Sequence, residues 1–163
     1  MKKITYLACS LILLIIINSC VGYEPIFSSK NLNFIIANHS IEGNKILGNR
    51  IYSKLFNLSK SQENNQDIRN VNLYINVSKN KTATSKDNTG KILEYKINLN
   101  VEVKIEDNLT GDDIINQSFE RSINFKVQDQ YSKTLRLENQ SIENLINNIY
   151  QDLLINFTNK LKI

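Results

Sequence analysis

The chain has 163 residues, enough for one domain, and a formal net charge of +4 at pH 7. This mixed and moderate charge does not by itself suggest a nucleic-acid-binding protein, and we expect no nucleic-acid partner. With one His, two Cys and five scattered Gly, the sequence has no metal or nucleophile constellation and no glycine-rich phosphate loop. We therefore expect no cofactor, no metal and no enzymatic activity.

The N-terminus has the order of an export signal. Met1-Lys2-Lys3 is a charged start, residues 4–17 are an almost unbroken apolar run, and Asn18-Ser19-Cys20 follows. As a helix the apolar run would span roughly 21 Å, short of a hydrocarbon core of about 30 Å. A cleaved signal is therefore favoured over a membrane span.

Ser19-Cys20 resembles the end of a bacterial lipobox, in which the cysteine is lipidated and becomes the new N-terminus. Ile17 stands where Leu is usual, and Asn18 replaces the usual small residue. An ordinary secretory signal with an incidental cysteine is the alternative. We predict a lipoprotein signal peptide over residues 1–19, lipidation of Cys20 and a lipidated tether over residues 20–30. Val21, directly after the cysteine, permits transfer to the outer membrane, as the lipoprotein resemblance implies.

The first part of the remaining domain, residues 31–163, is predicted to be strand, helix and strand. Residues 32–38 are a strand candidate, and Glu42-Gly43-Asn44 is a turn. A helix is expected over residues 45–58, because apolar residues recur there at spacings of three and four: Leu47, Ile51, Leu55 and Leu58. After a polar loop over residues 59–67, the apolar alternation predicts a strand over residues 69–79: Val71, Leu73, Ile75 and Val77.

Residues 93–105 carry the clearest pattern in the chain. Every odd position is apolar, and every even position is polar: Glu94, Lys96, Asn98, Asn100, Glu102 and Lys104. Side chains alternate faces along a strand, so this segment predicts a long strand in an antiparallel sheet covered on one side only. The turn over residues 107–111 leads to a return strand over residues 115–127, where Arg121 interrupts the inward apolar set.

The last predicted element is a long amphipathic helix over residues 134–160, after a connector over residues 128–133. Apolar residues recur along it at spacings of three or four and form one stripe: Ile142, Leu145, Ile146, Ile149, Leu153, Phe157 and Leu161. The order β-α-β-β-β-α predicts an α+β two-layer sandwich, a four-stranded, mostly antiparallel sheet with both helices on one face. The first strand is expected to run parallel to the second.

The lipobox, the residues Gly22-Tyr23-Glu24-Pro25-Ile26 and this element order together are similar to the LptE family of lipopolysaccharide-assembly lipoproteins of the alphaproteobacterial type. Val21 is inserted before the motif. The resemblance implies a protein anchored in the outer membrane on its periplasmic side. It would plug and help assemble an LptD-like β-barrel and contact lipopolysaccharide, with no reaction of its own.

The segment of residues 80–91 is expected to be a polar loop, and it brings four lysines near one another: Lys79, Lys81, Lys86 and Lys91. Lysine binds phosphate as a point charge, so these four are the predicted lipopolysaccharide-binding residues. A solvated hairpin loop is the alternative reading. At the level of function, the alternatives are a periplasm-facing lipoprotein accessory of another envelope transport complex and, more remotely, a lipid-anchored hydrolase.

Overall fold

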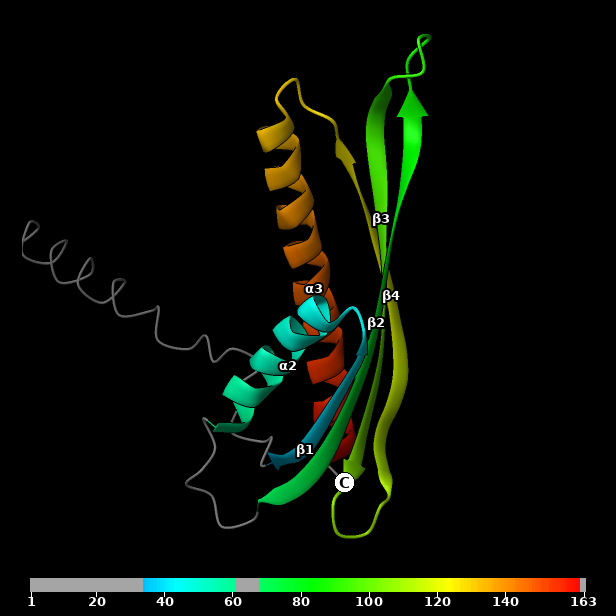
Figure 1. Ribbon diagram of the computed structural model, residues 1–163. Helices are drawn as coiled ribbons and strands as arrows, with labels where there is room; N and C mark the ends of the chain where they lie inside the picture. Colours follow the sequence, from blue (N-terminus) through cyan, green and yellow to red (C-terminus); the bar gives the residue numbers. More distant parts are fainter. Residues whose placement is uncertain (1–33, 61–67, 162–163) are drawn as a thin grey trace, which may run out of the picture.

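A computed structural model describes residues 34–60 and 68–161 of the chain (Figure 1). The elements follow in the predicted order: β1 (Phe34–Gly43), α2 (Lys45–Lys60), β2 (Arg69–Lys86), β3 (Ile92–Asp107), β4 (Asp113–Lys126) and α3 (Tyr131–Leu161). The signal peptide, Cys20, the tether and most of the predicted loop over residues 59–67 lie outside the described residues.

The four strands form one sheet in the order β1-β2-β3-β4. β1 pairs with β2 in parallel through the helical crossover α2, and the other two pairings are antiparallel. Both helices lie on the same side of the sheet, and the other side is left open (Figure 1). The predicted α+β two-layer sandwich is therefore confirmed, including the direction of the first strand.

The core lies between the sheet and the two helices. The odd-numbered residues of β3 from Ile97 to Ile105 are buried, as their alternation predicts. They meet the buried stripe of α3, in which Ile146, Ile149 and Leu153 have no exposed surface. Phe34 at the start of β1 packs edge-on against Phe157 near the end of α3, with ring centroids 4.7 Å apart. This contact joins the two ends of the described chain.

The turn between β1 and α2 forms where Glu42-Gly43-Asn44 predicts it. Gly43 has a φ of +68°, a conformation that L side chains rarely adopt. The Asn44 side chain then caps the helix, its Oδ1 accepting a hydrogen bond from the Leu47 N–H at 3.2 Å. One turn into the helix, Gly48 lies so close to the sheet that a Cβ would overlap the Ile41 side chain. The absence of a side chain at Gly48 therefore allows α2 to approach the sheet.

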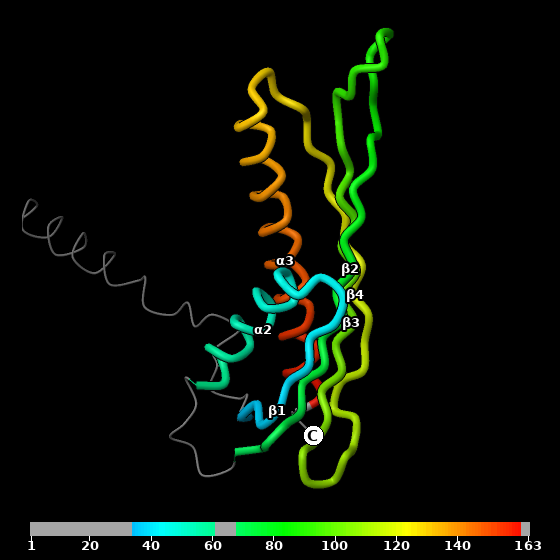
Figure 2. Tube along the Cα trace, in the orientation of Figure 1, coloured from blue at the N-terminus to red at the C-terminus, as the bar shows by residue number. Residues whose placement is uncertain are grey.

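The predicted loop over residues 80–91 is wrong. β2 continues to Lys86, paired with β3 as far as Ile92, and only residues 87–91 form the turn. The polar residues misled the prediction, because this part of β2 is exposed and shows no apolar alternation. It pairs with β3 in a part of the sheet that β1 does not reach. The resulting arm, residues 78–99, is two-stranded only where it extends beyond Lys126, the last residue of β4, and it runs past the start of α3 (Figure 2).

Smaller differences concern the ends of elements. β1 runs on to Gly43, α2 ends at Lys60 rather than residue 58, and α3 begins at Tyr131 rather than residue 134. Each of these element ends lies in polar sequence where the hydrophobic periodicity is weak, so that periodicity alone could not place the boundary.

Candidate functional site

The open side of the sheet is a continuous polar surface, which we call the open face. It is made of the even-numbered residues of β2, β3 and β4 and of the corresponding residues of β1. Glu94, Lys96, Asn98, Asn100, Glu102 and Lys104 lie on it, as the alternation of residues 93–105 predicts. The one large aromatic side chain of the described strands on this face is Tyr74, which is 42% exposed. No described helix covers the open face (Figure 1).

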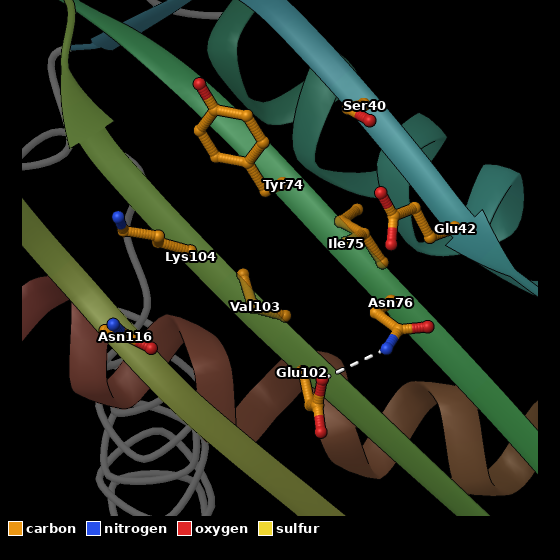
Figure 3. A pocket seen from close by; sticks show the side chains of 9 residues that line it. All are labelled: Ser40, Glu42, Tyr74, Ile75, Asn76, Glu102, Val103, Lys104 and Asn116. Atoms are coloured by element: carbon orange, nitrogen blue, oxygen red, sulfur yellow. Dashed lines mark hydrogen bonds between the residues drawn. The ribbon is translucent and has the colours of Figure 1, made fainter.

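Side chains on the open face bind one another across the strands. Figure 3 shows a shallow hollow of about 220 Å³ lined by Tyr74, Asn76, Glu102 and Lys104, with Ser40 and Glu42 contributed by β1. Within it the Asn76 amide donates a hydrogen bond to Glu102 Oε2 at 3.0 Å. Glu102, a charged group of this face, is thus partnered within the face itself.

Lys104 is the clearest example of such partnering. Its ammonium bonds Glu106, and it lies 3.2 Å from Asp113 Oδ1. Hydrogen bonds to Glu106 and then to Asp113 raise the pKa of Lys104 above its ordinary value. The charge on this lysine is therefore balanced locally and contributes little to a long-range field.

The structure separates the four predicted lysines into two pairs. Lys79 and Lys81 lie in β2 on the helix side of the sheet, where both meet Glu138 of α3, at 3.7 Å and 2.6 Å. Lys86 and Lys91 flank the turn at the end of the arm, where both are exposed. Lipopolysaccharide binding by the four lysines stays a prediction.

The turn at the end of the arm is organised by Asp87. Its Oδ1 accepts hydrogen bonds from the Thr89 hydroxyl at 2.7 Å and from the backbone N–H groups of Thr89 and Lys91. These bonds, the hydroxyl bond first, lower the pKa of Asp87. The carboxylate thus serves to hold the turn in shape between the two exposed lysines.

A cleft opens where the arm diverges from the first turns of α3. It has a volume of about 480 Å³, and apolar side chains contribute much of its lining: Ile92, Tyr95, Val127, Tyr131 and Leu135. Tyr131 is 81% exposed and Leu135 is 43% exposed, so this end of the helix presents apolar surface to solvent. Large exposed apolar groups beside a concave surface are a feature of ligand-binding sites.

Basic groups stand inside and beside this cleft. Lys81 and Lys91 both line it. The Lys81 ammonium lies 4.2 Å from the centroid of the Tyr95 ring as well as against Glu138. The cleft thus combines an apolar wall with the exposed Lys91 ammonium and with the Lys81 ammonium, which is already paired with Glu138 in the same lining. Sequence reasoning found Lys81 and Lys91 but missed Tyr131 and Leu135, which precede or begin the predicted helix and show no pattern there.

His39 is exposed, and its ring stacks on Tyr52 of α2 with centroids 4.0 Å apart. Over residues 34–60 and 68–161, no group of three or more His, Cys, Asp or Glu side chains is placed to hold a metal ion. In the same ranges, no helix is both long and apolar enough to cross a membrane.

Comparison with solved structures relates this fold to known proteins. A protein from Caulobacter crescentus described as a lipoprotein superimposes with a TM-score of 0.54 at 13% identity, covering 76% of this chain and 90% of its own. A minor lipoprotein from Acinetobacter baumannii superimposes with a TM-score of 0.51 at 14% identity, covering 77% of this chain and 92% of its own. Lipoprotein B from Nitrosomonas europaea has a TM-score of 0.51 at 13% identity, covering 77% of this chain and 84% of its own. The fold is shared with small bacterial lipoproteins.

No protein-family model matches the chain, and no curated protein matches it in sequence. The similarity is therefore one of fold, at identities too low to transfer any binding residue. It agrees with the fold that the LptE resemblance implies.

Proposed function

We propose that this chain is an outer-membrane lipoprotein, anchored through Cys20 on the periplasmic side, that occupies the lumen of an LptD-like β-barrel. It would help that barrel to assemble and take part in lipopolysaccharide transport to the cell surface. In this role the chain binds and positions other molecules and carries out no reaction itself. The fold shared with small lipoproteins and the export signal at the N-terminus support an envelope location.

The observation that carries the proposal is the open face. A protein that fills a large barrel meets a polar lumen, so its own surface must be polar, and it must be rigid enough to hold its shape. The open face is polar along its length, and cross-strand bonds such as Asn76 to Glu102 and Ser118 to Asn100, at 3.0 and 2.8 Å, hold its side chains. A sheet face that is polar apart from Tyr74, backed by a single core, suits contact with a polar wall.

The cleft at the end of the arm supports the lipid part of the proposal. Lipopolysaccharide combines acyl chains with phosphate groups, and the cleft combines Tyr95, Tyr131 and Leu135 with Lys81 and Lys91. Lysine recognises phosphate as a point charge, and the aromatic and aliphatic groups offer contact to an acyl chain. Lys86 stands next to this site at the end of β2.

The barrel partner is tested by co-purification in mild detergent from the native membrane. An outer-membrane β-barrel recovered in equal amount supports the plug. Recovery of inner-membrane transport components instead of a barrel would refute it and favour the accessory-subunit alternative. Mass analysis of the exported chain tests the anchor, since an unmodified Cys20 contradicts the lipoprotein assignment.

The lipid contact is tested with two double variants of the purified chain. Lys81→Gln with Lys91→Gln removes two charges from the cleft, and Lys96→Gln with Lys104→Gln removes two from the open face as the matched control. We expect the cleft variant to weaken binding to lipopolysaccharide at least tenfold at low salt, with a smaller loss at high salt because exposed charges are screened. Equal binding by the two variants at every salt concentration would remove the cleft from the site.

A further inference from the structure

The outer side of β4 is a free sheet edge, because β4 is last in the strand order and pairs only with β3. The Val127 N–H donates to the Leu93 carbonyl oxygen at 2.9 Å, in line with the register that pairs Lys126 with Glu94. Bonded pairs alternate along an antiparallel ladder, so the odd-numbered residues bond to β3. The backbone N–H and C=O groups of the even-numbered residues therefore point away from the sheet: Asn116, Ser118, Glu120, Ser122, Asn124 and Lys126.

This edge has a longer regular register than the other free edges among the described strands, although the inward-pointing charge of Arg121 and helix α3 lie beside it. Proteins block exposed edges with lysines, prolines, bulges or short strands. β1 has an irregularity between Ile36 and Asn38, and the free part of β2 carries Lys79, Lys81 and Lys86 and further irregularities after Ala83. The register of β4 is unbroken from Ile115 to Lys126. The one charged side chain of β4 that points toward the helices, Arg121, forms an ion pair with Asp152 of α3, with Arg121 Nη2 2.6 Å from Asp152 Oδ2.

Helix α3 runs beside this edge and forms a groove with it. Two polar contacts join the helix to β4 along this edge: the Arg121 ion pair with Asp152, and a hydrogen bond from the Asn156 amide to Gln117 Oε1 at 2.8 Å. Residues 116–121 of β4 and Asp152, Ile155 and Asn156 of α3 line a groove of about 620 Å³. Ile155 is 42% exposed, so the helical wall offers an apolar contact.

We propose that the β4 edge binds an extended segment of a partner protein, which adds as a further strand in the groove between β4 and α3. The outward N–H and C=O groups recognise a peptide backbone, as in strand addition to other sheet edges. Arg121 Nη1 donates to the Glu120 carbonyl oxygen at 3.1 Å and Gln128 Nε2 to that of Lys126 at 3.3 Å, so the segment replaces these two side-chain bonds. Alternate side chains of the segment would lie over Ile155 on the helix side, and the others would extend the polar open face. The segment that fits therefore alternates apolar and polar residues.

A second copy of this chain does not fit the edge through antiparallel pairing of two β4 strands. Helix α3 packs mainly on β4 and much less on β3. Pairing two copies of β4 would set their α3 helices about one strand spacing, roughly 5 Å, apart, whereas packed helices need about 8–10 Å. The occupant is thus a strand with no helix on that side. The inference does not depend on the barrel or on lipopolysaccharide.

The test uses the purified full chain and a synthetic peptide, acetyl-Lys-Thr-Val-Thr-Val-Thr-Val-Lys-amide. We expect hydrogen exchange by NMR to slow at least about tenfold at the Ser118 and Glu120 amides when the peptide binds, and to change little at Phe119 and Arg121, whose amides already bond to β3. The same peptide with N-methyl groups on its valines and threonines cannot donate to an edge, and we expect it not to bind. Equal binding of both peptides would overturn the proposal.

Two variants at one residue separate the backbone from the side chain. Ser118→Ala and Ser118→Pro both lose the hydroxyl that donates to Asn100 Oδ1 at 2.8 Å, but only proline removes the outward N–H. We expect peptide affinity to fall less than about twofold in the alanine variant and at least about tenfold in the proline variant. If circular dichroism shows that Ser118→Pro is unfolded, the N-methylated peptide against the wild-type chain decides.

Three further results would overturn the proposal: no binding of the unmethylated peptide up to about 1 mM, equal affinity of folded Ser118→Pro and Ser118→Ala, or exchange protection along β1 or the free part of β2 in place of β4. None of them bears on the barrel co-purification, so the two proposals fail separately.

Discussion

Replacing Gly43 with alanine should destabilise the fold for two reasons, one conformational and one steric, and the structure allows the two costs to be estimated separately. The residue has a φ of +68°, and this left-handed conformation costs a residue with a Cβ about 1 kcal/mol or more relative to glycine. A Cβ at this position would also overlap the backbone carbonyl oxygen of Val77. That oxygen accepts the Asn44 N–H at 2.7 Å, in the junction that sets α2 on the sheet.

Because backbone cannot rotate away as a side chain can, relieving the overlap must shift β1 from β2 or stretch this hydrogen bond. Overpacking of this kind costs about 1–3 kcal/mol. The conformational and steric costs together give an expected loss of about 3 kcal/mol. The chain should remain folded, because domains commonly have 5–15 kcal/mol of stability.

Gly111→Ala is the matched control. Gly111 has a similar φ of +76°, but a Cβ there would meet nothing within 4 Å. Its expected loss is the conformational cost alone, about 1 kcal/mol. Urea unfolding followed by circular dichroism measures both free energies, and the difference of about 2 kcal/mol is the steric part. Equal losses in the two variants would refute the assignment of Gly43 to a close backbone contact.

Three further predictions concern stability. Glu138→Gln removes the partner of both Lys79 and Lys81 and should cost about 1 kcal/mol by urea unfolding, more than Glu143→Gln, because the Glu138 side chain is 14% exposed and that of Glu143 43%. Leu153→Ala, at a position with no exposed surface, should lower the free energy of unfolding by about 2–5 kcal/mol, whereas Ile155→Ala should lower it by less than about 1 kcal/mol. Similar losses in the two variants would contradict the placement of the α3 stripe. Hydrogen bonds from the Leu109 and Thr110 N–H groups lower the pKa of Asp107 below its ordinary 3.8, so its contribution to stability is present above that pH and is lost as the pH falls through the lowered pKa. Asp107→Asn should therefore reduce the fall in the free energy of unfolding as the pH is lowered. An unchanged fall would show that Asp107 does not contribute to the acid sensitivity of the fold.

The elements with strong periodicity could be predicted from the sequence. Residues 93–105 alternate without a break, and their burial follows that alternation. The parallel pairing of β1 with β2 followed from chain order and the handedness of crossovers. The polar half of β2 could not be predicted, because its pairing with β3 is made by backbone groups and leaves no apolar trace in residues 80–86.

The candidate site shows the same division. The lysines were visible as a run of charge, but the sequence does not reveal that Lys79 and Lys81 face α3, since that depends on β2 being extended there. Arg121 broke the inward pattern of its strand, and the structure supplies the reason: its guanidinium reaches Asp152 at 2.6 Å across the layer. The cleft depends on the angle between the arm and α3, which no local pattern encodes.

The contact between Phe34 and Phe157 has a consequence for how the chain comes to be folded. The two rings are separated by nearly the whole described sequence, and the parallel pairing of β1 with β2 is likewise non-local. Contacts between such distant residues form slowly, because the intervening chain must first be ordered. This contact can therefore form only after the last turns of α3 have been synthesised, so closure of the sandwich comes late in folding.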